Sequence, residues 1–345
     1  MAHVPALQAS QDFQLVAVSS STLATAQQAA LQFNARHAFG SYQELLACPE
    51  VELVVVTVKV PYHFELASAA IAAGKAVYCE WPLANGLREA QTLHALAEQR
   101  GVRTVAGLQS RASPAMRYLR ELIRDGYVGE VLSATLLASG VIGGALIPQA
   151  FAYTLDPAFG AGILNVAGSH ALDAMSFVLG QQFADVATTL ANRRRSVQVA
   201  ETGETIAMRT PDQIALNGRL ACGAVVSAHI RGGMSRGANF RLEINGTRGD
   251  LVVSSTLGYP GIGDTSIQGG QDDDATVHEL PLPPQYRNQA GADGMAANVA
   301  ANYALLAADL RNGTHHAPSF ADALALHQLV DAIERSAADG ARRQT

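Results

Sequence analysis

Hydrophobic residues along the first hundred positions follow two alternating spacings. Short, almost wholly apolar runs predict strands, and apolar residues three or four positions apart predict helices between them. The strands are expected at 13–20, 51–60, 76–83 and 102–109, and the helices at 21–36, 41–50, 63–75 and 87–101. Because strands that are apolar on both faces and separated by helices form a parallel sheet covered on both sides, residues 1–109 predict a doubly wound, Rossmann-type α/β domain.

After Gln109 the spacing of apolar residues changes. Residues 113–131 predict one amphipathic helix, and much of the following sequence alternates apolar and polar positions, which is typical of an antiparallel sheet with one buried face. The segment "NGTRGD" (245–250) predicts a turn between two strands, and the Gly- and Asp-rich segment 261–279 predicts a mobile loop. With helices expected at 295–313 and 319–340, residues 110–345 predict an α+β domain with an open, mostly antiparallel sheet.

Composition and charge exclude several classes of protein. The 345 residues are 48% hydrophobic and 16% charged, as in ordinary globular proteins. A net charge of −6 gives no basic footprint for nucleic acid, and no apolar run reaches the roughly 20 residues that span a membrane. The first residues lack a secretory signal pattern, so a cytoplasmic location is expected. Cys48, Cys79 and Cys222 have neither disulfide nor metal-ligand spacing, so reduced thiols and no metal are expected.

The start of the predicted Rossmann-type domain departs from the usual pattern. Such a domain begins with a strand and a Gly-rich turn whose backbone N–H groups bind a pyrophosphate. This sequence opens instead with "MAHVPALQAS", which is typical of the end of the helix that follows that turn. Three interpretations remain open: the sequence starts downstream of the natural start, another segment fills the gap, or the domain has lost its phosphate-binding turn.

Three segments carry a resemblance to a known family. They are "PYHFELASAAIAAGKAVYCEWPLA" (61–84), "RASPAMRYLRELIRDGYVGEV" (111–131) and "GSHALDAMSFVLG" (168–180), and they resemble the Gfo/Idh/MocA oxidoreductases. "VKVPYH" (58–63), "EWPLA" (80–84) and "GLQSRASP" (107–114) are most similar to its Gal80-like branch, which is named for a yeast transcriptional regulator. The resemblance implies a dinucleotide-binding domain, a second open-sheet domain, NADP or NAD as cofactor, and a sugar or polyol as substrate.

Two positions differ from what the resemblance implies for an active oxidoreductase. The family's usual Glu-Lys-Pro segment here contains Trp81 in place of the lysine, which is thought to assist proton transfer. The aspartate usually found four residues before the histidine of the second motif is Val166 here, whereas His170 and Asp173 match. Since neither tryptophan nor valine exchanges a proton at neutral pH, the standard chemistry is expected to be altered or lost.

The candidate catalytic residues are His170 and Lys59. His170 is expected at the start of a helix, as a base for a substrate hydroxyl or as a structural histidine. Asp173 can orient His170 or cap that helix, and capping is slightly favoured. Lys59 follows a buried strand, where it can replace the missing lysine or, as we favour, pair with Glu80.

The candidate cofactor-binding residues follow the predicted strands. Serines in place of an acidic residue after the first of these strands favour NADP or a relaxed choice, or simply form a helix cap. Trp81 can cover a nicotinamide or sugar ring or fill volume, and His63 is expected to be structural. Gln109 and Arg111 suit ribose or substrate hydroxyls, or ordinary hydrogen bonds. The cofactor set is Ser19, Ser20, Val58, Lys59, Val60, His63, Glu80, Trp81, Pro82 and Gln109, and the substrate set is Arg111, His170 and Asp173.

Two functions follow from these observations. The first is an NAD(P)-dependent oxidoreductase acting on a sugar or polyol. The alternative is a non-catalytic, Gal80-like regulatory protein in which the dinucleotide changes the affinity for a protein partner. In either case a homodimer through the open sheet of the second domain is expected, because that sheet would otherwise expose a large surface.

Overall fold

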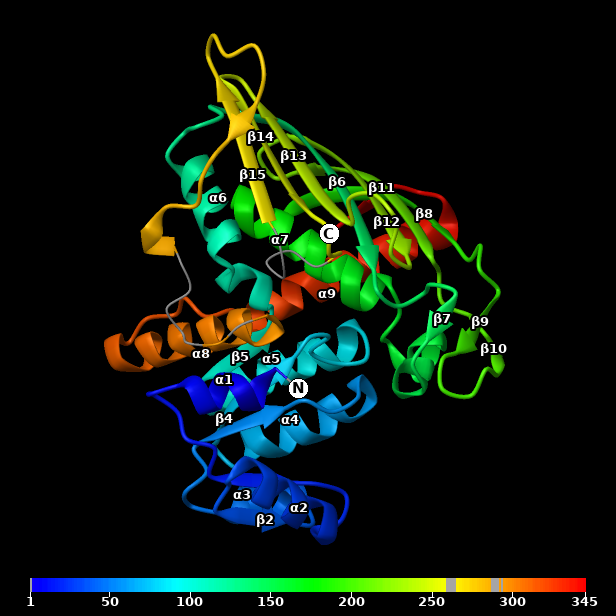
Figure 1. The fold of residues 1–345 in the computed structure, drawn as a ribbon. Helices are drawn as coiled ribbons and strands as arrows, with labels where there is room; N and C mark the ends of the chain where they lie inside the picture. Colours follow the sequence, from blue (N-terminus) through cyan, green and yellow to red (C-terminus); the bar gives the residue numbers. More distant parts are fainter. Residues whose placement is uncertain (1, 259–264, 287–291, 293) are drawn as a thin grey trace. The chain divides into compact units, whose positions relative to one another are not determined.

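The computed structural model describes residues 2–258, 265–286, 292 and 294–345 (Figure 1). The chain divides into two units, Met1–Ala112 with Asn288–Leu324, and Ser113–Arg287 with Ala325–Thr345. Division of the sequence at residue 109 leaves α8 (Met295–Asn312) in the second domain, whereas the structure groups this helix with unit 1. The reason is packing, since α8 buries Val299 and Tyr303 against strands of unit 1.

Unit 1 contains the predicted parallel strands. β1 (Ala17–Ser19) pairs with β2 (His37–Phe39), and β3 (Leu53–Val56), β4 (Ala76–Glu80) and β5 (Thr104–Gly107) form a sheet in that order. β1, β3, β4 and β5 lie inside the four predicted strand segments, whereas β2 was not predicted from the sequence. The Rossmann-type fold class is confirmed. Among the described residues, no strand pairs with both β1 and β3.

The helices of unit 1 cover both faces of the β3–β4–β5 sheet. α1 and α8 pack on one face, where Tyr78 and Tyr303 are buried, and α4 lies on the other (Figure 1). Ser41 caps α3, and the cap of α2 is Thr22 rather than Ser19 or Ser20. The helices are α1 (His3–Ala9), α2 (Leu23–Phe33), α3 (Tyr42–Ala47), α4 (His63–Ala72) and α5 (Leu87–Arg100), with 3-10 turns η1 (Val60–Tyr62) and η2 (Gln109–Ala112).

Unit 2 is built on one large, mostly antiparallel sheet. Over the described residues its order is β16-β15-β14-β13-β6-β12-β11-β8-β17, and β6 with β12 is its one parallel pair. Its strands are β6 (Val131–Gly140), β8 (Phe183–Ala191), β11 (Gln213–Leu220), β12 (Val225–Gly232), β13 (Phe240–Gly246), β14 (Gly249–Ser255), β15 (Thr265–Gln271), β16 (His278–Glu279) and β17 (Arg343–Gln344). The predicted turn at 245–250 joins β13 to β14, as expected.

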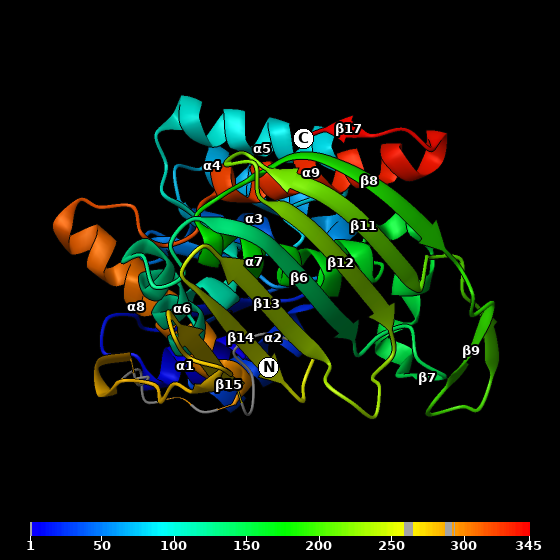
Figure 2. The same ribbon diagram turned by 90° about the horizontal axis from the view of Figure 1, so that it is seen from above.

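Helices cover one face of this sheet. They are α6 (Pro114–Arg124), α7 (Ser169–Leu179) and α9 (Phe320–Asp339), and Figure 2 shows α7 and α9 behind the strands. Burial alternates along β11 and β12, so one face of each strand packs inward and the other is exposed. A smaller sheet of β7 (Leu146–Ile147), β9 (Ser196–Val199) and β10 (Thr205–Ala207) has its own apolar cluster.

The prediction of a mobile loop at 261–279 was partly wrong. Residues 265–271 form β15, which pairs with β14 along its length, and Ile267 is buried. Gly269 and Gly270 allow other segments of the same chain to pack closely against β15. A Cβ on Gly269 would lie 2.6 Å from the Tyr127 hydroxyl. Composition indicated a loop because glycine is common in loops, but here it serves packing. Residues 261–264 of that prediction lie outside the described residues.

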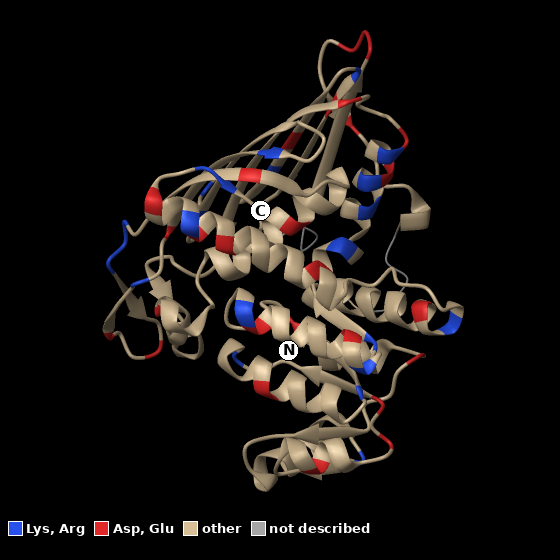
Figure 3. Cartoon of the chain, turned by 180° about the vertical axis from the view of Figure 1, so that it is seen from behind, with Lys and Arg blue, Asp and Glu red and all other residues tan. Residues whose placement is uncertain are grey.

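The described residues show no separation of positive from negative charge and no membrane-spanning helix. Lys and Arg are interspersed with Asp and Glu along the described chain (Figure 3). In the part of the chain that the structure describes, every helix is too short or too polar to cross a membrane.

Candidate functional site

The carboxyl ends of β3, β4 and β5 lie at one edge of the unit 1 sheet. Val56 is in register with Cys79, and Glu80 with Gly107, so the three parallel strands end side by side. Ligands of open α/β sheets bind outside this edge. The residues that follow these strands are those singled out in the sequence, namely Val58, Lys59 and Val60 after β3, Glu80, Trp81 and Pro82 at the end of β4, and Gln109 after β5.

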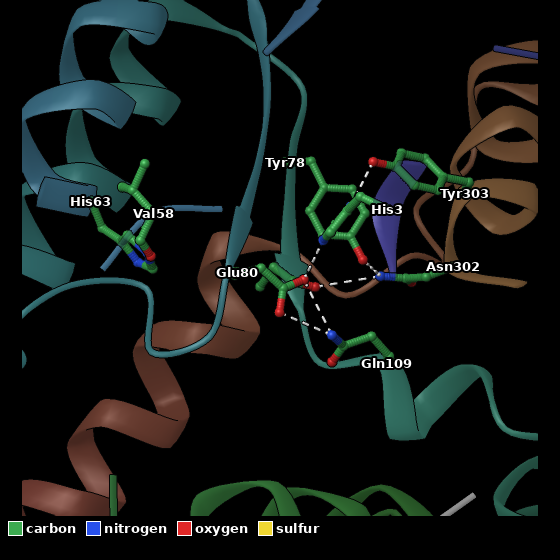
Figure 4. Close-up of polar contacts among 9 residues, drawn as sticks. His3, Val58, His63, Tyr78, Glu80, Gln109, Asn302 and Tyr303 are labelled. Carbon is green, nitrogen blue, oxygen red and sulfur yellow. Dashed lines mark hydrogen bonds and ion pairs between the residues drawn. The ribbon is translucent and has the colours of Figure 1, made fainter. Parts of the chain in front are cut away.

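The Glu80 carboxylate is the centre of a hydrogen-bonded cluster at this edge (Figure 4). His3 Nε2 lies 2.8 Å from Glu80 Oε1, and Gln109 Nε2 donates to Oε1 at 3.1 Å and to Oε2 at 3.0 Å. The Glu80 side chain is 24% exposed. Both oxygens therefore have protein donors, and the carboxylate holds α1 and the start of η2 against the end of β4.

Both ring nitrogens of His3 are hydrogen-bonded to other side chains. His3 Nδ1 lies 2.8 Å from the Tyr303 hydroxyl. Burial, with the charge of Glu80 adding to it, raises the pKa of Tyr303, so this hydroxyl keeps its proton and can donate to Nδ1. The Glu80 carboxylate only accepts, so the hydrogen bond to it requires a proton on His3 Nε2. Tyr303, His3 and Glu80 thus form a hydrogen-bonded chain that ends on the carboxylate.

Aromatic packing fixes the His3 ring in this position. The ring meets Tyr78 edge-on with centroids 5.1 Å apart, and Tyr303 with centroids 5.8 Å apart. Asn302 Nδ2 donates to the Tyr78 hydroxyl at 2.8 Å, which supplies a partner to a buried polar group. These side chains come from α1, β4, η2 and α8, four elements of unit 1. We call them the strand-end cluster, which consists of His3, Tyr78, Glu80, Gln109, Asn302 and Tyr303.

Gly107 is required beside this cluster. A Cβ at this position would lie 2.7 Å from Glu80 Oε1 and 2.8 Å from Glu80 Cα. Because the second contact is with backbone in the same sheet, it cannot be relieved by rotating a side chain. Glycine at the end of β5 leaves room for the carboxylate.

His63 connects the ends of β3 and β4. It is buried, with Nδ1 2.7 Å from the Pro82 carbonyl oxygen and Nε2 2.9 Å from the Val58 carbonyl oxygen. The structural role expected for His63 is consistent with these contacts. The Trp81–Pro82 peptide bond is cis, and Trp81 is buried, with 5% of its surface exposed.

Of the other predicted cofactor residues, Val60 and Pro82 are buried, and four are at least partly accessible. Lys59 and Val58 are exposed just after β3, and Ser19 is exposed at the carboxyl end of β1, followed by half-buried Ser20. The preferred pairing of Lys59 with Glu80 stays a prediction.

Arg111 forms an ion pair with Asp322, a residue of α9 that belongs to unit 1. Its Nη1 donates to Asp322 Oδ1 at 2.6 Å, and the Ser319 backbone N–H donates to Asp322 Oδ2 at 2.7 Å. Burial opposes ionisation of Asp322, but the Arg111 charge and the Ser319 hydrogen bonds outweigh it and lower the pKa. Arg111, predicted to bind substrate, thus has an internal partner.

The second predicted motif lies in unit 2. His170 and Asp173 are both buried in α7, which follows a π-helical turn, η5 (Leu164–Gly168), containing Val166. His170 is the second residue of α7, as expected. The preferred capping role of Asp173 was wrong, because the N-cap is Gly168 and Asp173 lies inside the helix. Its spacing from His170 leaves the orienting role as a prediction.

The sequence did not indicate His3, Asn302 or Tyr303. His3 lies 300 positions before Tyr303, and no motif links the two. Only the packing of α8 on the unit 1 sheet brings them together, and that packing was not predicted from periodicity.

The fold and the strand-end cluster define a protein with a Rossmann-type unit and a second, open-sheet unit, and comparisons with known proteins identify its family. Residues 1–108 match the model of the oxidoreductase family with an NAD-binding Rossmann fold (GFO_IDH_MocA), and residues 114–255 match the Gal80p C-terminal domain. An uncharacterized oxidoreductase of Synechocystis is 30% identical over 73% of this chain and 68% of that protein. The chain belongs to the Gfo/Idh/MocA oxidoreductase family, in its Gal80-like branch.

Other relatives carry either an enzymatic or a regulatory name. Dehydrogenase aclE of Aspergillus oryzae is 38% identical, and the match covers 50% of this chain and 47% of that protein. The GAL80 regulatory protein of Kluyveromyces lactis is 28% identical, over 73% of this chain and 59% of that protein. The chain thus spans about half to three fifths of these two relatives.

Solved structures share the fold. A super-repressor mutant of Gal80p from Saccharomyces cerevisiae superposes with a TM-score of 0.89 at 22% identity, over 99% of this chain and 93% of that chain. A levoglucosan dehydrogenase in complex with NADH and levoglucosan gives a TM-score of 0.86 at 20% identity, over 99% and 95%. The predicted resemblance and fold class are therefore confirmed.

Proposed function

We propose that the chain is an NAD(P)-dependent oxidoreductase that acts on a sugar or polyol. The observation that carries the proposal is the shared edge of β3, β4 and β5, where the candidate cofactor residues follow each strand. The exposed Lys59 ammonium suits an anionic dinucleotide, and the exposed Ser19 hydroxyl suits a ribose or 2′-phosphate. Because Ser19 and Ser20 are neutral, NADP or a relaxed choice is favoured over strict NAD.

The proposed roles divide between binding and proton transfer. The dinucleotide supplies hydride chemistry, while Ser19, Ser20, Val58, Lys59, Val60, Trp81 and Pro82 bind or orient it. Glu80, Gln109 and His63 hold the strand ends in place through the contacts described above. His170 takes the substrate hydroxyl proton, with Lys59 as a second candidate and with Asp173 and Arg111 binding or orienting groups. The sugar-class substrate is supported by the fold shared with levoglucosan dehydrogenase.

A regulatory function is the second candidate, and two residues favour it. Trp81 is buried at the position of the family's lysine, and Val166 cannot exchange a proton. The match of residues 114–255 to the Gal80p C-terminal domain points the same way. In this case the dinucleotide changes the affinity for a protein partner without turnover. Under either function we expect a cytoplasmic protein and a homodimer.

The experiment that tests the proposal uses Trp81, the sole tryptophan. Titration with NADH and NADPH, with excitation of Trp81, is expected to give saturable quenching and energy transfer to the reduced nicotinamide. A Trp81→Phe variant removes the optical signal, and calorimetry of that variant separates loss of signal from loss of binding. Failure of both cofactors to bind would contradict a dinucleotide-dependent function of either kind.

Turnover then distinguishes the two candidates. A panel of sugars and polyols is assayed with the cofactor that binds. We expect turnover that falls at least about 100-fold in His170→Asn, with the dinucleotide affinity unchanged. Binding without turnover over the whole panel supports the regulatory candidate instead.

A further inference from the structure

Three side chains with different ligand atoms meet near the start of β2, apart from the strand-end cluster. His37 is the first residue of β2, and Cys48 and Glu50 lie between α3 and β3. A His37 ring nitrogen, Cys48 Sγ and a Glu50 carboxylate oxygen all lie within 4.8 Å of one another. Among the described residues, this is the group of His, Cys, Asp and Glu whose geometry is suited to hold a metal ion.

We propose that His37, Cys48 and Glu50 form a Zn²⁺ site, completed by a water molecule. Zinc combines thiolate, imidazole and carboxylate ligands in tetrahedral sites, whereas Mg²⁺ and Ca²⁺ prefer oxygen ligands alone. Tetrahedral zinc with bonds of about 2.0–2.3 Å places neighbouring ligand atoms roughly 3.5 Å apart. The ligand atoms lie within 4.8 Å of one another, so binding of zinc requires shifts of about 1 Å.

A hydrogen bond already aligns two of the three ligands. His37 Nε2 lies 2.8 Å from Glu50 Oε1, and zinc would replace the proton between these atoms. Arg36 Nη1 donates to the other Glu50 oxygen at 2.6 Å, and Arg36 Nη2 donates to Gln14 at 3.0 Å. Such supporting hydrogen bonds orient a ligating carboxylate.

Surface ion pairing alone gives an incomplete account of the cluster. Arg36, Glu50 and His37 have side chains that are 56%, 43% and 36% exposed, and ion pairs with this exposure contribute little to stability. The contacts of Glu50 with Arg36 and His37 do not involve Cys48. The Cys48 thiol nevertheless lies within 4.8 Å of the His37 and Glu50 ligand atoms. A soft sulfur donor beside imidazole and carboxylate is what separates a zinc site from a surface ion pair.

The proposed metal would join the first residue of β2 to the segment that leads into β3. It would close a short loop around α3, and it would bind the native chain more tightly than the unfolded chain, so Zn²⁺ is expected to raise thermal stability. None of the three ligands belongs to the proposed dinucleotide or substrate sets, so the zinc site stands or falls independently of the proposed function.

The test uses the full chain, reduced and freed of metal with a chelator. Calorimetry with Zn²⁺ alone is expected to give one ion per chain. Cys48→Ala and His37→Gln are each expected to weaken Zn²⁺ binding at least about 100-fold. Removing a direct ligand is expected to lower the affinity more than removing a residue that only hydrogen-bonds a ligand. Cys222→Ala is the matched control, because Cys222 is an exposed thiol of unit 2, and it is expected to leave the affinity unchanged.

Cobalt provides a readout of the thiol itself. Co²⁺ is expected to give a thiolate-to-metal charge-transfer band with the native chain and with Cys222→Ala, and no band with Cys48→Ala. Circular dichroism of the metal-free variants checks their folding, and Cys48→Ser replaces Cys48→Ala if the latter misfolds. Absence of Zn²⁺ binding by the native chain, or an unchanged affinity and cobalt band after Cys48 is replaced, would overturn the proposal.

Discussion

His3 and Glu80 are 77 positions apart, yet His3 Nε2 lies 2.8 Å from Glu80 Oε1. The contact ties the first helix of the described chain to the end of β4, at the edge where the candidate cofactor residues follow the strands. Because His3 Nδ1 is also hydrogen-bonded to the Tyr303 hydroxyl, the carboxylate, the imidazole and the phenol form one hydrogen-bonded chain. Each member therefore depends on the other two.

Coupling between His3 and Tyr303 is the first prediction. His3→Ala leaves the Tyr303 hydroxyl buried without its partner, and Tyr303→Phe removes the hydrogen-bond partner of His3 Nδ1, so each is expected to destabilise unit 1 by about 1–3 kcal/mol. The double variant is expected to cost less than the sum, with a coupling energy of at least about 0.5 kcal/mol. Urea unfolding followed by Trp81 fluorescence measures this, because Trp81 lies in unit 1. Additive effects of the two substitutions would contradict the coupling between His3 and Tyr303.

Gly107→Ala is expected to destabilise the strand-end cluster. The added Cβ would lie 2.8 Å from Glu80 Cα, so the strands must separate or the carboxylate must move, at a cost of about 1–3 kcal/mol. Gly237→Ala is the control, because a Cβ there meets nothing within 4 Å and its φ is not in the left-handed region. Urea unfolding followed by circular dichroism compares the two variants. Equal stability of Gly107→Ala and the native chain would contradict this prediction, because it would mean that the sheet edge accommodates the added Cβ at little cost in free energy.

The strand ends were predictable from the sequence, but the cluster on them was not. Apolar runs bounded by helical segments located β3, β4 and β5, and the residues after them followed from the rule that parallel strands bind ligands at their carboxyl ends. His63 was expected to be structural because it opens a helix, and its contacts with two carbonyl oxygens are consistent with that expectation. What local pattern cannot supply is the partner of a side chain from a distant segment, such as Tyr303 for His3.

The same limit explains two incorrect predictions. Composition indicated a loop over residues that form β15, because the pairing of that strand with β14 depends on a neighbour and not on its own propensity. Asp173 was favoured as a cap because helix capping is common for aspartate, whereas η5 continues into α7 and moves the helix start upstream of it. The metal-ligand cluster escaped the sequence analysis for a related reason, since His37 lies outside any recognised Cys spacing.

Acid is expected to destabilise the protein through His327. This α9 side chain is buried, and burial lowers its pKa from 6.5 to about 4. The unfolded chain therefore binds a proton that the folded chain does not between pH 6.5 and about 4, and stability falls as pH decreases through this range. At about 1.4 kcal/mol for each pH unit, the loss approaches about 3 kcal/mol.

A substitution isolates this contribution to acid sensitivity. His327→Gln has no titrating group, so its free energy of unfolding is expected to depend less on pH between 6.5 and 4 than that of the native chain. His278→Gln, at an exposed position on β16, is the control for replacing a histidine by glutamine. Urea unfolding at several pH values gives the comparison. Parallel profiles for the native chain and His327→Gln would contradict the prediction.

A homodimer through the open face of the unit 2 sheet gives the last prediction. Ala215 is exposed on β11, in register with Thr189 of β8 and His229 of β12, so it lies within this face and not at an edge of the sheet. A two-fold interface would bring the same face of both subunits together, and Ala215→Arg would place a charge in it. Light scattering at micromolar concentration is expected to give about twice 36.1 kDa for the native chain and for Gln27→Arg, which alters an exposed residue of α2 in unit 1, but a single-chain mass for Ala215→Arg. A native mass near 36.1 kDa would refute the dimer, and a dimeric Ala215→Arg would place its interface elsewhere on the chain.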